Sequence, residues 1–101
     1  MAELWREKMK IVNSPLYEEQ LKSVLSELFG DDIKGAKSFK LYLDTIILNM
    51  PTKVKKYKKS VYFDDEHIKD IEHQGFTIPF FVDDINNTYV VLGIISNINH
   101  N

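Results

Sequence analysis

The sequence predicts an α+β fold in which an N-terminal strand and an antiparallel helical hairpin pack on a small, mostly antiparallel β-sheet. Three observations predict this fold. Apolar residues recur with a helical period of 3.6 between residues 15 and 50. The period then changes to two between residues 67 and 95, as it does in strands. The length of 101 residues is that of one domain with one core.

The composition is that of a globular protein, with 44% hydrophobic and 28% charged residues. A disordered chain would have fewer large apolar residues, and no stretch approaches the run of about 18 apolar residues that a membrane span needs. The absence of cysteine excludes disulfides, a thiolate nucleophile and thiolate metal sites. The first residues lack the basic-then-apolar order of a secretory signal, so we expect a cytoplasmic protein.

The first half of the chain contains the predicted strand and both predicted helices. Residues 8–13 are typical of a short strand. Ser14 and Pro15 then mark a helix start, with an N-cap hydroxyl and a proline at the first helical position. An apolar stripe at helical spacing follows up to Phe29, and Gly30 ends the helix. The members of this stripe are Tyr17, Leu21, Val24, Leu25 and Leu28.

A second helix is predicted to begin at Asp31-Asp32 and to end at Pro51, which cannot continue a helix. Its apolar stripe has the same helical spacing. The members are Ala36, Phe39, Leu43, Ile46, Ile47 and Met50. Because the connection between the two helices is so short, they are expected to run antiparallel.

The second half is predicted to form a β-meander of three strands, over residues 67–74, 76–82 and 88–95. In the middle strand Phe76, Ile78 and Phe80 share one face, and Pro79 predicts an irregular or open edge because it has no N–H to donate. The last segment is almost continuously apolar, as expected of a strand covered on both faces. We expect one domain over residues 1–101, with residues 1–8 as an arm if translation starts at Met9, and residues 97–101 as a frayed tail.

The charges are divided unequally along the chain. Residues 1–60 carry twelve Lys or Arg against eight Asp or Glu, whereas residues 61–101 carry one cation against seven acids. Five of the lysines fall within residues 53–59. This run has three interpretations: a solvated loop, a contact for phosphate or an acidic partner, or an internal contact that partly neutralises residues 64–66 and Asp70. Tyr57 within the run either stacks on a base or anchors the loop to the core.

Two further groups have weaker functional interpretations. His67 and His73 are too far apart along a strand to bind one ion, so we interpret them as surface or capping histidines and predict no metal site. Residues 64–66 are three consecutive acids, which we interpret as a turn. Phe81 falls opposite the face of Phe80, beside Thr77 and Pro79, and if exposed it would be a docking point for a protein partner.

Several segments together resemble the RelE/ParE superfamily, the toxins of bacterial type II toxin–antitoxin systems. The resemblance covers about residues 9–96. It rests on the order and spacing of five segments: residues 10–15 (KIVNSP), 49–51 (NMP), 57–63 (YKKSVYF), 68–82 (IKDIEHQGFTIPFFV) and 89–95 (YVVLGII). It implies a β-α-α-β-β-β order and no cofactor. It also implies a cognate antitoxin whose C-terminal segment wraps around the toxin, the docking partner that Phe81 would contact, and roles in plasmid stabilization and growth inhibition.

The resemblance implies one of two activities. ParE-like toxins poison DNA gyrase without cutting nucleic acid, whereas RelE-like toxins are ribosome-dependent endoribonucleases that cut messenger RNA. RelE-like enzymes place Lys and Arg after the second helix and on the sheet, and often add a Tyr or His near the C-terminus. Here Lys53, Lys55 and Lys56 match the first set, but the last two predicted strands contain no Arg, Lys or His.

We therefore favour the ParE-like activity, with the target contacted by the lysine run and no enzymatic step. That contact set is Lys53, Lys55, Lys56, Tyr57, Lys58 and Lys59. The alternative is a ribosome-dependent RNase that uses Lys53, Lys55, Lys56 and the tail residue His100. A third interpretation is a degenerate, non-toxic scaffold that only binds its antitoxin.

Overall fold

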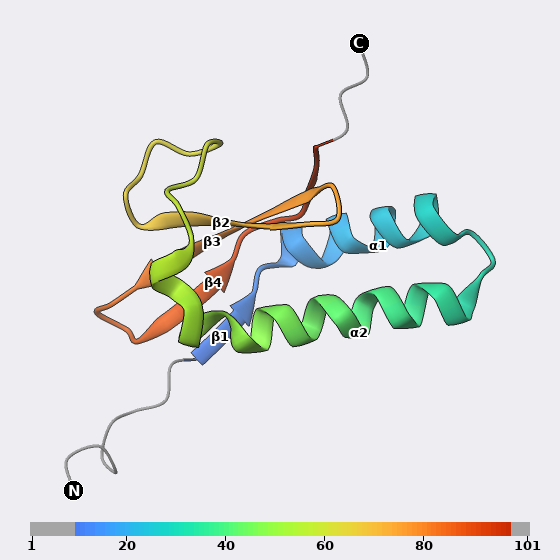
Figure 1. The fold of residues 1–101 in the computed structure, drawn as a ribbon, viewed down its shortest axis with the longest axis horizontal. Coiled ribbons are helices and arrows are strands. Elements are labelled where there is room, and N and C mark those ends of the chain that lie inside the picture. The colour runs from blue at the N-terminus through green and yellow to red at the C-terminus, as the bar shows by residue number, and fades with distance from the viewer. Residues whose placement is uncertain (1–9, 98–101) are drawn as a thin grey trace, which may run out of the picture.

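The computed structural model describes residues 10–97 (Figure 1), so the predicted arm, residues 1–8, and the candidate His100 lie outside the described residues. The elements in chain order are β1 (Lys10–Asn13), α1 (Pro15–Phe29), α2 (Ile33–Asn49), the 3-10 helix η2 (Met50–Lys56), β2 (Ile68–His73), β3 (Phe76–Asp83), β4 (Thr88–Val91) and β5 (Ile95–Ser96). The predicted α+β class and element order are confirmed, with a fifth short strand in addition.

The sheet is mixed and mostly antiparallel, with the strand order β1-β4-β3-β2. β1 pairs with β4 in parallel, and β3 pairs with β2 and β4 antiparallel. β5 pairs antiparallel with the beginning of β3. The first and last long segments of the chain thus lie side by side in the sheet, and β3 is its central strand.

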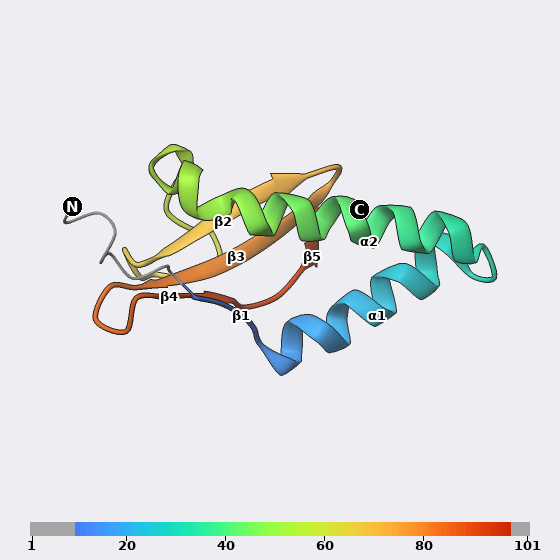
Figure 2. The ribbon, with the colours of Figure 1, turned by 90° about the horizontal axis from the view of Figure 1, so that it is seen from below.

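The two helices form the predicted antiparallel hairpin, as the views in Figures 1 and 2 show. The Ser14 hydroxyl caps α1 by accepting from the Tyr17 N–H at 3.1 Å, and it donates to the Leu92 carbonyl at 3.1 Å. Gly30 ends α1 with a φ of 54°, and Asp32 caps α2 by accepting from the Gly35 N–H at 3.0 Å. The Ser14 contacts therefore fix the start of the hairpin to the sheet as well as beginning the helix.

The hydrophobic core lies between this hairpin and one face of the sheet. The helical residues of the core belong to the predicted stripes, but Leu25 and Ile46 are only partly buried against it, Ala36 is not part of the cluster, and Leu28 is exposed. Phe76, Ile78 and Phe80 point into the core from β3, as the period of two predicts. The buried cluster consists of Tyr17, Leu21, Val24, Phe39, Leu43, Ile47, Met50, Ile71, Phe76, Ile78, Phe80, Tyr89, Val91 and Ile94.

The prediction of a single last strand over residues 88–95 is wrong, because the segment is divided into the two strands β4 and β5. Pro79 has no N–H to offer on this side of β3, although its carbonyl accepts from the Leu92 N–H at 2.8 Å. The Ile94 N–H donates instead to the Gln20 side chain of α1 at 2.9 Å. The irregular edge predicted at Pro79 is thus confirmed, and it interrupts the neighbouring strand.

The second face of β3 is covered at Thr77 and Pro79, although Phe81 further along the same face is only half-buried. Thr77 and Pro79 are almost fully buried. The Thr77 hydroxyl donates to the Asn97 side chain at 2.7 Å, and the Asn97 N–H donates to the Gly75 carbonyl at 2.7 Å. The predicted frayed tail is therefore wrong at Asn97, which is fixed to β3, while residues 98–101 lie outside the described residues.

Candidate functional site

The lysine run begins in a 3-10 helix rather than in the predicted solvated loop. Pro51 ends α2, and the Thr52 hydroxyl donates to the Asn49 carbonyl at 2.8 Å, which tightens the chain into η2. Met50 is fully buried and Val54 is partly buried against the core. η2 is thus held to the protein by its apolar residues, while the lysines between them point to solvent.

Tyr57 anchors the end of the run to the core. Its ring packs edge-to-face on the ring of Phe80, with 5.6 Å between the centroids. Burial raises the pKa of the Tyr57 hydroxyl. The Tyr57 carbonyl accepts from Lys69 Nζ at 3.2 Å, which connects the run to β2. Of the two roles considered for Tyr57, the structure shows the anchoring contact.

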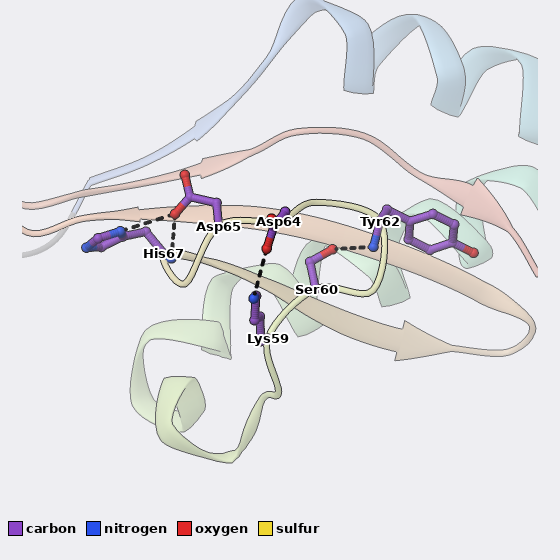
Figure 3. A network of polar contacts seen from close by, with 6 residues as sticks. All are labelled: Lys59, Ser60, Tyr62, Asp64, Asp65 and His67. Carbon is purple, nitrogen blue, oxygen red and sulfur yellow. Dashed lines mark hydrogen bonds and ion pairs between the residues drawn. The ribbon is translucent and has the colours of Figure 1, made fainter.

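Four lysines around this anchor form a platform of exposed and unpaired positive charge. Within residues 10–97 none of their ammonium groups has an ion pair or a hydrogen bond. We call Lys53, Lys55, Lys56 and Lys58 the lysine platform. Lys59 differs, because its ammonium group lies 3.3 Å from Asp64 in the exposed ion pair drawn in Figure 3. The neutralisation expected for the run is thus limited to Lys59.

A hollow of about 350 Å³ lies between the lysines and the outer edge of β2. It is lined by Lys56, Tyr57, Lys58, Lys59, Val61, Asp70 and Glu72. Two of these side chains, Asp70 and Glu72, are carboxylates, so a phosphate placed here would meet negative as well as positive charge. The hollow suits a partner that presents both apolar and charged groups better than it suits a nucleic-acid backbone.

The chain between the run and β2 continues along the edge of the sheet. The Ser60 N–H donates to the Ile68 carbonyl at 2.8 Å, and the Asp70 N–H donates to the Lys58 carbonyl at 3.1 Å. Asp70 is 8% exposed, and its Oδ2 accepts from the Val61 N–H at 3.0 Å. The segment that carries the lysines is therefore positioned by backbone pairing and by one buried carboxylate.

The predicted turn at the acidic residues 64–66 lies slightly later, over residues 65–68, where the Ile68 N–H donates to the Asp65 carbonyl at 3.1 Å. Asp65 accepts from the His67 N–H at 2.8 Å and lies 3.2 Å from His67 Nδ1, as Figure 3 shows. The hydrogen bond from the His67 backbone is the main cause that lowers the pKa of Asp65. Among the residues that the structure describes, no three His, Asp or Glu side chains are grouped to hold a metal ion.

The two histidines make separate packing contacts. The exposed His67 ring lies 6.1 Å from the ring of Phe81, whereas His73 packs on Phe39 and Tyr42 of α2. Neither histidine lines the hollow beside the lysine platform. The predicted surface position holds for His67, whereas His73 is partly buried against α2, where its Nε2 has no hydrogen-bond partner among the described residues.

Phe81 is half-buried rather than exposed, on the opposite face of β3 from Phe80. It lines a smaller hollow of about 210 Å³ at the turn between β3 and β4. Val82 and Ile85 add apolar surface there, and Asp83 and Asp84 add negative charge. Phe81 therefore lies in an accessible apolar depression, separate from the lysine platform.

Sequence reasoning missed one exposed feature, the loop that follows the lysine run. Val61, Tyr62 and Phe63 are consecutive large apolar residues, and all three are exposed. Because the three apolar residues are consecutive, they match neither the helical period of 3.6 nor the strand period of two, and the periodicity of the sequence therefore assigned them no structural or functional role. The available signal was their position, directly after five lysines and before three acids.

Comparisons with known proteins identify the fold. No family model matches the chain, and no curated protein matches it. A chain of the chromosomal ParDE toxin–antitoxin system from P. aeruginosa is similar in structure, with a TM-score of 0.63, 12% identity, and coverage of 87% of this chain and 95% of that one.

Two other solved structures are similar at comparable coverage. A conserved hypothetical protein from Helicobacter pylori has a TM-score of 0.56 and 17% identity, covering 87% of this chain and 93% of its own. The RelBE2 toxin–antitoxin complex from Mycobacterium tuberculosis has a TM-score of 0.50 and 11% identity, covering 89% of this chain and 99% of the matched one.

At these identities the comparisons establish architecture, and the resemblance read from the sequence is confirmed at that level. Within residues 10–97, no helix is both long enough and apolar enough to span a membrane. With its N-terminal strand, helical hairpin and mixed sheet, the chain has a RelE/ParE-like fold.

Proposed function

We propose that this chain is the toxin of a bacterial type II toxin–antitoxin pair and that it acts by binding a large cellular target such as DNA gyrase. The similarity of fold to the ParDE and RelBE2 structures supports the toxin role. The observation that carries the binding role is the lysine platform, which is anchored to the core yet has no ionic partner within residues 10–97. Unpaired charge on a rigid support is a feature of interaction surfaces.

The surroundings of the platform favour binding over RNA cleavage. Cleavage through the 2′-hydroxyl needs a group that takes a proton and another that supplies one, both beside the phosphate. The only Lys on strands β2, β3 and β4 is Lys69, whose ammonium group is bonded to the Tyr57 carbonyl. His73 on β2 packs on α2 instead. A non-enzymatic, ParE-like action therefore fits these positions better than a RelE-like one.

The activity is tested by expressing the chain in bacterial cells and following translation and the DNA damage response in parallel. We expect growth to stop with a damage response and intact messages. Rapid loss of protein synthesis with cleaved messages would replace this proposal by the ribosome-dependent RNase that uses Lys53, Lys55, Lys56 and His100. Normal growth with a folded, soluble product would leave only the non-toxic scaffold.

We also propose that the cognate antitoxin contacts the depression around Phe81. The half-buried ring and the neighbouring Ile85, which is 93% exposed, offer apolar surface to an extended segment. Asp84 lies beside them and has no ion pair within the described residues, so a basic residue of the antitoxin would find a partner there. A disordered segment that folds on binding uses such combinations of apolar and charged contacts.

Replacing Phe81 by serine is expected to weaken antitoxin binding about tenfold, because burying part of a phenylalanine ring contributes roughly 1.5 kcal/mol. Titration calorimetry with the protein encoded by the neighbouring short gene measures the change. Ile33→Ser, an exposed apolar substitution at the start of α2, is the matched control and should bind as the wild type does. Unchanged affinity of a folded Phe81→Ser variant would remove Phe81 from the contact.

A further inference from the structure

We infer that Val61, Tyr62 and Phe63 form a docking loop that inserts into an apolar pocket on the protein target, while the lysine platform beside it pairs with carboxylates around that pocket. This inference rests on the proposed function and names the chemistry of its target surface. The partner is a protein, and the loop supplies the apolar anchor of the contact.

The three side chains of the docking loop are exposed together. Val61 is 80% exposed, Tyr62 47% and Phe63 40%. Single exposed apolar residues are common on protein surfaces, whereas contiguous ones indicate an interaction site. Val61 lines the hollow of about 350 Å³ next to the lysines, and all three line a second hollow of about 400 Å³.

The base of the docking loop is fixed by buried polar groups. The Asp70 carboxylate accepts from the Val61 N–H at 3.0 Å, and the Ser60 hydroxyl accepts from the Tyr62 N–H at 3.1 Å. Both Asp70 and Ser60 are more than nine-tenths buried. Figure 3 shows the Ser60 contact at the base of the loop.

The two sides of the docking loop are also held. The Tyr62 hydroxyl donates to the Asn97 side chain at 3.3 Å, and that same side-chain oxygen accepts from the buried Thr77. On the other side the Lys59–Asp64 ion pair closes the loop, as Figure 3 shows. Because the loop is ordered before it meets a partner, little conformational entropy remains to be lost on binding.

The neighbouring charges indicate what kind of partner the docking loop fits. The lysine platform, which precedes the loop, is unpaired and positive, whereas the acidic segment 64–66 that follows the loop carries the carboxylates of Asp65 and Glu66, and only Asp64 in that segment is paired with a lysine. A protein surface with an apolar pocket for the loop and acidic groups that face the lysine platform is complementary to this arrangement. A nucleic acid fits less well, because the carboxylates of Asp70 and Glu72 line the adjoining hollow and would repel its phosphates. The rings of Tyr62 and Phe63 could stack on bases, so the oligouridine measurement below tests this alternative directly.

The experiment compares the wild type with the double variant Val61→Ser/Phe63→Ser by induced expression in bacterial cells. We expect the wild type to stop growth and the double variant to grow at the uninduced rate. Ile33→Ser removes an apolar side chain of similar exposure at the far end of the helical hairpin, and it should stop growth as the wild type does (Figure 1). Purified proteins are compared by thermal unfolding and by binding of a 20-nucleotide oligouridine measured by fluorescence anisotropy.

The outcomes separate this inference from the proposed function. If the wild type does not stop growth, the proposed function fails and the docking loop fails with it. If the double variant stops growth as well as the wild type and the Ile33→Ser control, only the docking loop is overturned. Loss of growth arrest together with loss of oligouridine binding also overturns it, because the loop would then contact nucleic acid. If the double variant does not fold, the single variant Val61→Asp replaces it, because Val61 is the most exposed of the three residues. Growth arrest by a folded Val61→Asp protein would then overturn the docking loop, and loss of arrest with retained oligouridine binding would support it.

Discussion

Replacing Phe80 by alanine is expected to lower the free energy of unfolding by about 3–5 kcal/mol, since a fully buried phenylalanine leaves a cavity that its neighbours fill only in part. Phe80 has no exposed surface and lies on the central strand β3. Its ring contacts Tyr57 at 5.6 Å and Tyr89 at 6.3 Å between centroids. The substitution therefore removes contacts to the lysine run and to β4 at once.

Urea unfolding followed by circular dichroism measures this loss, with Phe63→Ala as the matched control. Phe63 is 40% exposed, so the same change of side chain is expected to cost less than about 1 kcal/mol there. In the Phe80→Ala protein we also expect faster hydrogen exchange of the Tyr57 N–H, which donates to the Val54 carbonyl at 3.2 Å. Equal losses for the two alanine variants would contradict the central position of Phe80.

The helices could be predicted from the sequence because their end signals are local. Ser14, Gly30, Asp32 and Pro51 each act on backbone groups within four residues, through caps, a positive φ or a missing N–H. The period of the apolar residues between these points then fixes which side of each helix faces the sheet. Leu28 departs from this pattern, since at the last turn of α1 it is 47% exposed.

The division of the last strand was not predicted, although one residue within it is a local sign of a break. Residues 88–95 have high β-propensity except at Gly93, which lies in the interruption between β4 and β5. A Cβ atom at Gly93 would meet the Gln20 side chain of α1, so glycine permits the close approach of that side chain here. The break follows from Pro79 on the neighbouring strand and from the Gln20 side chain of α1, which takes the Ile94 N–H. Pairing partners of this kind become visible only in the folded chain.

For the candidate site, the positions of the lysines could be predicted from the sequence, but the structural elements that hold them in place could not. The lysine run was evident, whereas the 3-10 helix and the contact of Tyr57 with Phe80 depend on packing between distant residues. The docking loop was missed for a similar reason. Its backbone is satisfied by the buried side chain of Asp70, nine residues further along the chain, and periodicity cannot reveal such a bond.

Reversing the charge of the lysine platform, by changing Lys53, Lys55, Lys56 and Lys58 to glutamate together, is expected to abolish growth arrest. The platform has no internal ionic partners within residues 10–97, so the change removes no folded-state ion pair and should leave thermal unfolding nearly unaltered. Association with an acidic partner surface should slow by a factor of about 10–10³, because attraction over several ångströms becomes repulsion. Growth after induction and thermal unfolding of the purified variant are the two measurements.

Four other exposed lysines provide a control with the same total charge. Changing Lys10, Lys22, Lys34 and Lys37 to glutamate alters the net charge by the same amount but places the acids on β1 and on the helices. This variant is expected to stop growth as the wild type does. Equal loss of arrest in both variants would mean that total charge governs the effect and would contradict a localised site. Because the two proteins differ only in where the charge lies, a difference between them can arise only from the position of the platform beside η2 and the docking loop.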